Sequence, residues 1–305
     1  MKRALIALAL YTAASVAGAD TPETALLKAR SAEFRKDVVQ VADNVYTFTG
    51  HSVQPVSMVI GKDGLVIIDT GMDAQSAQAV LAEMRKITDL PVKAIILTHG
   101  HGDHTGGLPV FAAEGSPDIW ARGNFGDEAH AFEHAGLTIT RKRGARQGGF
   151  LLPPEKRINN GVAQAYYPKR GGAVFGADKS TKPTHCLTES RKTIEVAGIK
   201  FDLVALNGET KDALYVWYPD QRVLFSGDNF YKSWPNLYPI RGSAYRDVQA
   251  WADSVDKMLQ ENPDKLVPGH TRPITDKALV IEMLTNYRDA IRFVFDKTID
   301  GMNQG

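Results

Sequence analysis

Four side chains that can bind metal ions lie within six residues of one another, in the stretch LTHGHGDHTGG. His99 and His101 are two residues apart, so in an extended segment both point to the same side and can share one ion. Asp103 and His104 come after a bend at Gly102 and can face a second ion. Polar loop residues that only cap a helix would account for one histidine, whereas three histidines and an aspartate predict a zinc site.

The motif begins where a predicted strand ends. Residues 92–97 form a nearly continuous apolar run with β-branched side chains, as expected for a strand covered on both faces. Residues 65–69 are predicted to form another strand, and a helix capped by Asp73 lies between the two. Open α/β sheets bind their ligands at the carboxyl ends of such strands, which is where the motif stands.

Each half of the chain supplies strands and then helices. This order predicts an α/β fold in which two sheets pack face to face with helices outside. The other predicted strands are residues 45–49, 56–60, 118–121, 193–196, 199–206, 213–218 and 223–225.

Four ligands do not complete two zinc sites, so the ends of later strands must supply the others. Glu209, Asp228 and His270 each stand beside a glycine directly after an apolar strand-like run. Asp69 ends the strand before the motif and is expected to orient a zinc-binding imidazole, the alternative being that it caps a helix or turn.

The first 19 residues have the pattern of an export signal. Lys2 and Arg3 precede an apolar stretch that ends in the small residues Ala17-Gly18-Ala19. We expect cleavage after Ala19 and a periplasmic or secreted protein, since the apolar stretch is shorter than the ~18 residues that favour a membrane span. Residues 20–305 are then expected to form a single domain.

Composition limits the partners. Of 305 residues, 43% are hydrophobic, and 36 basic residues nearly balance 35 acidic ones, which predicts a globular protein without a nucleic-acid partner. The single cysteine, Cys186, cannot form an internal disulfide. No stretch after the signal is apolar enough to span a membrane, and nothing indicates an oligomeric state.

Residues 141–182 differ from the rest of the chain. They contain many glycines, prolines, basic residues and aromatic residues without a sustained period. Long irregular segments in compact domains commonly serve as lids or binding loops, so we expect a substrate-covering insertion here, with a plain surface loop as the alternative.

The chain resembles the metallo-β-lactamase superfamily, whose signature of His-x-His-x-Asp-His, a later Gly-Asp and a later Gly-His is present. Glu209 stands where that superfamily usually has histidine, and the next carboxylate, Asp228, follows 19 residues later (228 minus 209). This arrangement is similar to the zinc alkylsulfatases, although that family has glutamate in place of Asp228. The segments 236–242 and 245–251 also resemble alkylsulfatase patterns, Asn-Leu-x-x-x-Arg-Gly and Arg-Asp-x-x-x-Trp. The resemblance covers about residues 45–273, the catalytic domain only.

The resemblance implies the αβ/βα sandwich of that superfamily and two zinc ions per chain. One ion would be held by His99, His101 and Glu209, the other by Asp103, His104 and His270, with Asp228 between them. Asp103 and Asp228 are thus the candidate catalytic carboxylates. Two zinc ions lower the pKa of a shared water toward neutrality, so the bridging hydroxide needs no side-chain base.

The expected function is hydrolysis of sulfate esters, with alkyl sulfates as the anionic small-molecule substrates. Arg241, Lys232 and Arg170 are expected to neutralise the sulfate, because cationic side chains bind oxyanions directly. Tyr238 and Trp234 are expected to receive an apolar tail.

Two other functions remain open. A β-lactam or lactone hydrolase would use the same two ions, although Glu209 adds negative charge to the first of them. A non-catalytic zinc-binding protein is the second alternative, but a binding scaffold has no need of two open zinc sites.

Overall fold

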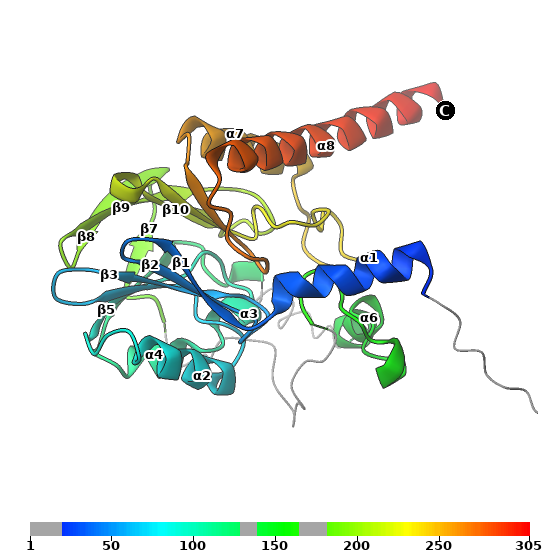
Figure 1. Cartoon of the computed structure of the whole chain (residues 1–305). Helices are drawn as coiled ribbons and strands as arrows, with labels where there is room; N and C mark the ends of the chain where they lie inside the picture. The colour runs from blue at the N-terminus through cyan, green and yellow to red at the C-terminus, as the bar shows by residue number, and fades with distance from the viewer. Residues whose placement is uncertain (1–19, 129–138, 165–181) are drawn as a thin grey trace, which may run out of the picture.

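Two mixed sheets form the centre of the fold in the computed structural model, which describes residues 20–128, 139–164 and 182–305 (Figure 1). The predicted export signal and Arg170 therefore lie outside the described residues. The first sheet has seven strands in the order β1 (Asp37–Ala42), β2 (Val45–Thr49), β3 (Val56–Ile60), β4 (Leu65–Ile68), β5 (Val92–Ile96), β6 (Asp118–Arg122) and β7 (His185–Leu187). Strands β1 to β4 pair antiparallel, whereas β4 to β7 pair parallel.

The second sheet has five strands. Its order is β12 (Lys265–Pro268), β11 (Val223–Gly227), β10 (Leu214–Tyr218), β9 (Ile199–Ala205) and β8 (Arg191–Val196). Only β11 and β12 pair parallel. The carboxyl ends of β5, β11 and β12, together with that of β9, supply the loops that hold the predicted ligands.

Apolar side chains from both sheets form one core between them. Val66 and Ile96 of the first sheet belong to the same buried cluster as Phe201, Val216 and Phe225 of the second. The two sheets therefore pack face to face, as the sequence predicts.

Helices cover the outer faces. Helices α2 (Ala74–Met84) and α4 (Leu108–Ala112) pack on the first sheet, and α7 (Val248–Gln260) and α8 (Lys277–Gln304) pack on the second (Figure 1). Asp73 caps α2, as predicted, by accepting the Ser76 N–H at 2.8 Å. None of the described helices combines the length and apolar composition that crossing a bilayer requires.

The remaining described helices are short. They are α1 (Pro22–Arg30), α3 (Gly102–Thr105), α6 (Ile139–Gln147) and the 3₁₀ helices η1 (Ser31–Phe34), η2 (Pro154–Lys156) and η3 (Pro219–Gln221). The expectation that residues 141–182 are irregular is thus wrong for their first part, which lies in α6. Helix α6, ITRKRGARQ, has too few apolar side chains to show a helical period.

Candidate metal centre

The predicted ligands come from four loops at one edge of the two sheets. His99 and His101 follow β5, and the short helix α3 carries Asp103 and His104. Glu209 follows β9. The other two ligands, Asp228 and His270, follow β11 and β12, which are parallel neighbours.

The structure brings all seven predicted ligands together. Their nitrogen and oxygen atoms form three groups, within each of which the ligand atoms lie within 4.8 Å of one another. The groups are His99–His104–Asp228, Asp103–His104–His270 and His101–Glu209–Asp228.

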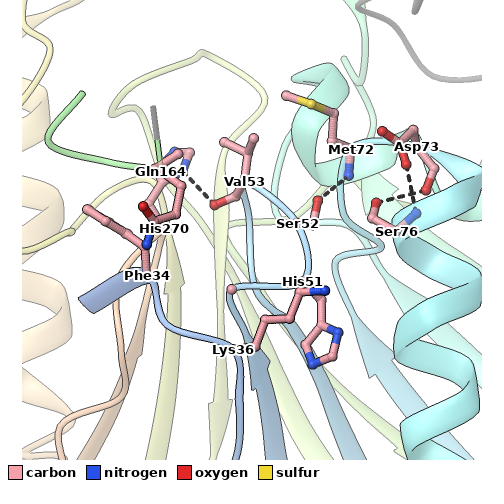
Figure 2. Close-up of a pocket in the computed structure, with 12 residues that line it drawn as sticks. Phe34, Lys36, His51, Ser52, Val53, Met72, Asp73, Ser76, Gln164 and His270 are labelled. Atoms are coloured by element: carbon pink, nitrogen blue, oxygen red, sulfur yellow. Dashed lines mark hydrogen bonds between the residues drawn. The ribbon is translucent and has the colours of Figure 1, made fainter. Parts of the chain in front are cut away.

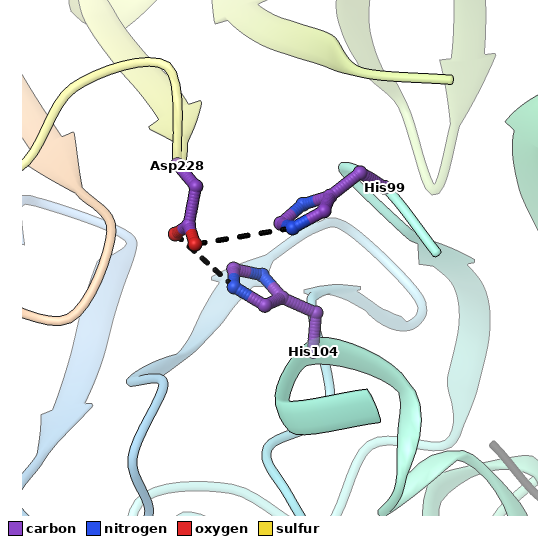
Figure 3. A group of neighbouring side chains, drawn as sticks. All are labelled: His99, His104 and Asp228. Carbon is purple, nitrogen blue, oxygen red and sulfur yellow. Dashed lines mark ion pairs between the residues drawn. The ribbon is translucent and has the colours of Figure 1, made fainter. Parts of the chain in front are cut away.

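Asp228 lies at the centre of these groups. Its Oδ1 is 3.1 Å from His104 Nε2, and its Oδ2 is 3.9 Å from His99 Nε2 (Figure 3). Oδ2 is also 2.9 Å from His270 Nε2. Asp228 thus lies within 4 Å of histidines from both implied ligand sets, as expected of a carboxylate that two ions would share.

The other two carboxylates lie beside different histidines. Asp103 Oδ2 is 3.8 Å from His270 Nε2, and Glu209 Oε1 is 4.0 Å from His101 Nδ1. Asp103 and Glu209 thus lie beside histidines of different sets implied by the sequence resemblance, whereas the group His99–His104–Asp228 contains one histidine from each set. Each set then contains two histidines and one carboxylate of its own.

Glycine allows the ligands to approach one another. A Cβ at Gly269 would lie 2.3 Å from Asp228 Oδ1, which is closer than real Cβ contacts. Only glycine therefore lets the loop before His270 pass directly beside this carboxylate.

Asp69 fixes the orientation of His104. The Asp69 carboxylate accepts the His104 Nδ1–H at 2.7 Å, which leaves His104 Nε2 free to face Asp228. Asp69 is itself held by Thr98, whose N–H donates to it at 2.8 Å. Asp69 has a left-handed backbone (φ 55°), a conformation that aspartate tolerates better than most residues.

Gln54 is a site residue that the sequence analysis missed. Its amide Nε2 donates to Asp69 Oδ2 at 3.4 Å, and its Oε1 accepts the His270 N–H at 2.8 Å. One buried side chain thus connects the Asp69–His104 pair with the loop of His270. Its role depends on contacts across the fold, and no local sequence pattern indicates it.

Arg246 is the second missed residue. Its Nη1 forms an ion pair with Glu209 Oε1 at 2.8 Å, and both side chains are almost fully buried. The sequence indicated Arg246 only as part of a motif that resembles the alkylsulfatases, without a role.

Burial and neighbouring charges act in opposite directions on the histidines. Burial lowers the pKa of His99 and of His101, so both imidazoles are neutral and can offer a lone pair. Burial also acts to lower the pKa of His104, but the carboxylates of Asp228 and Asp69 outweigh it and raise that pKa. In the absence of a cation, His104 thus carries the charge that balances its acidic neighbours.

The carboxylates show the same opposition. Burial acts to raise the pKa of Asp228, but the charges of His270 and His104 outweigh it and hold that pKa well below its usual range. Burial raises the pKa of Glu209 to about 7, even though Arg246 opposes the rise. The site therefore needs positive charge near Glu209 to keep all its carboxylates ionised.

Three buried atoms at this centre have no hydrogen-bond partner of good geometry within the described part of the chain: His99 Nε2, and the atoms His104 Nε2 and Asp228 Oδ1, which lie 3.1 Å apart as an ion pair. Buried polar atoms without partners are costly, and native proteins usually satisfy them. A divalent cation among them would satisfy all three. Imidazole nitrogens and carboxylate oxygens are zinc ligands, so the residues present fit the metal that the sequence predicts.

The predicted substrate residues lie further out. Lys232 Nζ forms an ion pair with Glu33 at 2.9 Å, so its charge is already partly balanced. Arg241 is close enough to His101 to contribute to lowering the pKa of that imidazole. Trp234 and Tyr238 are 55% and 78% exposed, and both can contact a ligand at the surface.

A cavity of about 150 Å³ adjoins the centre at His270 (Figure 2). His270 Nδ1–H donates to the Val53 carbonyl at 3.3 Å, so the imidazole separates the cavity from Asp228. The cavity is lined by Phe34, Lys36, Gly50, His51, Ser52, Val53, Met72, Asp73, Ser76, Ala163, Gln164 and His270. Both apolar and polar groups are thus available beside the predicted ligands.

Comparison with known proteins identifies related families. The model of the family described as "Metallo-beta-lactamase superfamily" matches residues 52–270. A linear primary-alkylsulfatase from Pseudomonas sp. (strain ATCC 19151) is 33% identical over 256 residues, which are 81% of this chain and 47% of that protein. The alkyl/aryl-sulfatase BDS1 of Saccharomyces cerevisiae is 28% identical over 278 residues, 87% of this chain and 42% of that protein. The chain thus spans less than half the length of these two relatives, which are named as hydrolases of sulfate esters.

Solved structures show the same fold. The sec-alkylsulfatase Pisa1 from Pseudomonas sp. superposes with a TM-score of 0.79 at 23% identity, covering 88% of this chain and 43% of that one. A metallo-beta-lactamase from Pontibacter korlensis superposes with a TM-score of 0.53 at 19% identity, covering 83% of this chain and 100% of that one. At such identities the likeness concerns the fold alone, and it confirms the predicted arrangement of two sheets with helices outside.

Proposed function

The chain belongs to the metallo-β-lactamase superfamily, and from this premise we propose that it hydrolyses sulfate esters with two zinc ions. One observation carries the proposal: a buried carboxylate, Glu209, faces His101 where the superfamily usually has histidine. The chain is also similar to proteins named alkylsulfatases. Because one fold hosts many reactions, the ligand set rather than the fold supports the choice of substrate.

One proposed ligand set, Asp103–His104–His270, is also a group of neighbouring side chains in the structure, and the other joins His99 to the His101 and Glu209 of a second group. His99, His101 and Glu209 would hold one ion, Asp103, His104 and His270 the other, and Asp228 would contact both. Bound zinc would supply Lewis acidity and a water of lowered pKa. The buried atoms of His99, His104 and Asp228 that lack hydrogen bonds support these assignments.

The protein's own groups have distinct tasks in this proposal. Asp69 holds His104 in the tautomer that leaves Nε2 free. Arg241, whose charge acts on His101, would bind the oxygens of the sulfate group, because a guanidinium can donate to two oxygens of an oxyanion at once. Lys232 would add positive charge at longer range, since Glu33 already binds its ammonium group.

The organic part of the ester would lie in the cavity beside His270. Phe34, Val53 and Met72 give this cavity an apolar wall, and a space of about 150 Å³ fits a group of benzene size. A longer chain would extend toward the exposed rings of Trp234 and Tyr238. We propose that the segment 141–182 covers bound substrate.

The first experiment combines metal analysis with a substrate panel. Full-length protein and its Asp228→Asn variant are loaded with zinc, their zinc content is measured, and hydrolysis of dodecyl sulfate, a chromogenic cephalosporin, a lactone and a phosphodiester is compared. We expect two zinc ions per chain and preference for the sulfate ester, with the rate lost in Asp228→Asn. Preference for the cephalosporin or lactone would be compatible with the zinc assignments but would refute sulfate esters as the substrate class. Stoichiometric zinc without turnover of any substrate would favour a non-catalytic zinc-binding protein.

We also propose export to the periplasm or the exterior. Lys2 and Arg3 before an apolar stretch support this proposal. Mass spectrometry of the protein isolated from its source should find a chain that begins at Asp20. An intact Met1 in the mature protein would refute cleavage.

A further inference from the structure

A buried ion pair lies directly behind the candidate metal centre. Arg246 Nη1 and Glu209 Oε1 are 2.8 Å apart, and their side chains are only 2% and 6% exposed. The same Oε1 is the atom that lies 4.0 Å from His101 Nδ1. One carboxylate oxygen of Glu209 is therefore placed between a guanidinium and a proposed zinc ligand.

Either charge of this pair would destabilise the folded protein if it were buried without the other. Taking a charged group out of water costs several kcal/mol unless an opposite charge and hydrogen bonds compensate. Glu209 has only Arg246 as a cationic ion-pair partner, apart from the histidines, among the ion pairs of the described residues. Among the described arginines and lysines, only Arg246 thus compensates the charge of this carboxylate through an ion pair.

The guanidinium of Arg246 is held through one nitrogen, Nη1, while its buried Nε and Nη2 make no hydrogen bond among the described residues. Its Nη1 also donates to the Asn236 carbonyl at 2.5 Å, and the Asn236 N–H donates to the Tyr231 hydroxyl at 2.7 Å. Asp247, the next residue, caps α7 by accepting the Ala250 N–H at 3.0 Å. Arg246 thus stands at a fixed helix start and not on a free loop.

The same helix start reaches the loop of the central carboxylate. Trp251 Nε1 donates to the carbonyl of Asn229 at 2.9 Å, one residue after Asp228. The first turn of α7 therefore positions two of the proposed zinc-binding carboxylates, Asp228 through the backbone and Glu209 through Arg246.

We propose that Arg246 is a positioning residue that holds the Glu209 carboxylate directed toward His101, so that the group His101–Glu209–Asp228 can hold its zinc ion. This inference rests on the proposed function, because it assumes that the group binds metal. The other group, Asp103–His104–His270, has no ion pair with Arg246 among the described residues. The effect of Arg246 is therefore confined to one of the two ions.

Sharing Glu209 also has a chemical consequence. A carboxylate that is paired with a guanidinium donates less negative charge to a bound cation than an unpaired one. Arg246 thus allows a carboxylate to replace the usual histidine while the adjacent ion keeps much of its Lewis acidity.

The test measures zinc binding in Arg246→Lys, Arg246→Met, Glu209→Gln and the double variant Arg246→Met/Glu209→Gln. The matched control is Arg122→Met, because Arg122 Nη1 donates to the carbonyls of Leu206 and Lys211, on either side of Glu209, without touching its carboxylate. Stepwise zinc affinities are determined by chelator competition in the full chain. Circular dichroism of the zinc-free protein monitors the fold.

We expect Arg246→Met to weaken one of the two zinc ions by about 10- to 100-fold, as is typical when a partner of a metal ligand is removed. Arg246→Lys should restore part of this affinity, and Arg122→Met should bind both ions normally. Adding Arg246→Met to Glu209→Gln should weaken binding little beyond the loss in Glu209→Gln alone, since Arg246 acts on the ion only through Glu209. Arg246→Met alone leaves the Glu209 carboxylate buried without its ion-pair partner. If that variant does not fold, the double variant can still be measured, because its glutamine side chain at position 209 is neutral.

Normal binding of both ions by Arg246→Met would overturn the proposal, as would equal weakening of both ions. A large further loss in the double variant relative to Glu209→Gln would also overturn it. Wild-type protein that binds two zinc ions but does not cleave sulfate esters would refute the proposed substrate and leave the role of Arg246 intact. Wild-type protein that binds no zinc would overturn both.

Discussion

Asp69 Oδ2 lies 2.7 Å from His104 Nδ1, and both side chains are buried. This contact fixes which nitrogen of His104 faces the centre. A carboxylate behind a metal-binding imidazole also raises the basicity of that imidazole. The first prediction follows from this pair.

Asp69→Asn should weaken the zinc ion held by the Asp103–His104–His270 group by about 10- to 100-fold. The asparagine retains the size of the side chain and tolerates the left-handed backbone at this position, so the fold should persist. Zinc competition titration measures the affinity, and the unfolding temperature of the zinc-free protein checks the fold. Unchanged affinity for both ions would show that the contact only stabilises the fold.

Glycine at position 269 gives a second prediction. A Cβ there would lie 2.3 Å from Asp228 Oδ1, so Gly269→Ala should displace the central carboxylate and lower both zinc content and hydrolysis. Zinc per chain is measured by elemental analysis after gel filtration. Gly301→Ala is the control, because a Cβ at this helical position meets nothing within 4 Å. The control should keep its zinc and gain about 0.5–1 kcal/mol of stability. Full zinc content in Gly269→Ala would contradict the close approach.

The sequence predicts that the seven candidate ligands lie close together because the signal of each is local. Asp228 and His270 stand beside glycines where apolar runs end, and the fold does bring these ends together. Gln54 and Arg246 have no such signal. Gln54 contacts Asp69, 15 residues away (69 minus 54), and Arg246 contacts Glu209, 37 residues away (246 minus 209). Only the packed sheets reveal these pairs.

The fold shows the same division. Strands with long buried runs, such as 45–49 and 92–96, were predicted nearly to the residue because burial imposes the apolar pattern. The edge strand β1 has mostly half-buried side chains, and β7 has only three residues, so neither shows a clear period. Helix α6 was missed for the same reason. Local composition thus predicts the buried central strands of the sheets but not the edge strands or the polar helix α6.

Arg241 gives a third prediction, on the substrate. If its guanidinium binds the sulfate group, Arg241→Ala should raise KM for dodecyl sulfate by about 10- to 100-fold, since a hydrogen bond to a charged group contributes about 1.5–3 kcal/mol. KM for a neutral lactone should change little, and zinc content should remain normal. Steady-state kinetics on both substrates with the zinc-loaded enzyme separate the effects. Equal increases for both substrates would remove this role of Arg241.

Acid should weaken the contact between α7 and α8. Burial acts to raise the pKa of Asp256, but hydrogen bonds from Arg288 and Arg292 outweigh it and lower that pKa below its usual value. The folded state thus holds its proton less tightly than the unfolded state. The stabilisation is full above the unfolded pKa of ~3.9 and disappears as pH falls through the folded value.

Asp256→Asn should therefore destabilise the zinc-free protein by about 0.5–1 kcal/mol at neutral pH, a small effect because solvent screens these half-exposed pairs. Urea unfolding of both proteins at several pH values measures the difference, which should vanish once the pH is below the folded pKa and shrink in high salt. Asp300→Asn, which removes an exposed pair with Lys297 at the end of α8, is the control and should change stability little. A difference that persists undiminished into acid would show that Asp256 acts through packing and not through its charge.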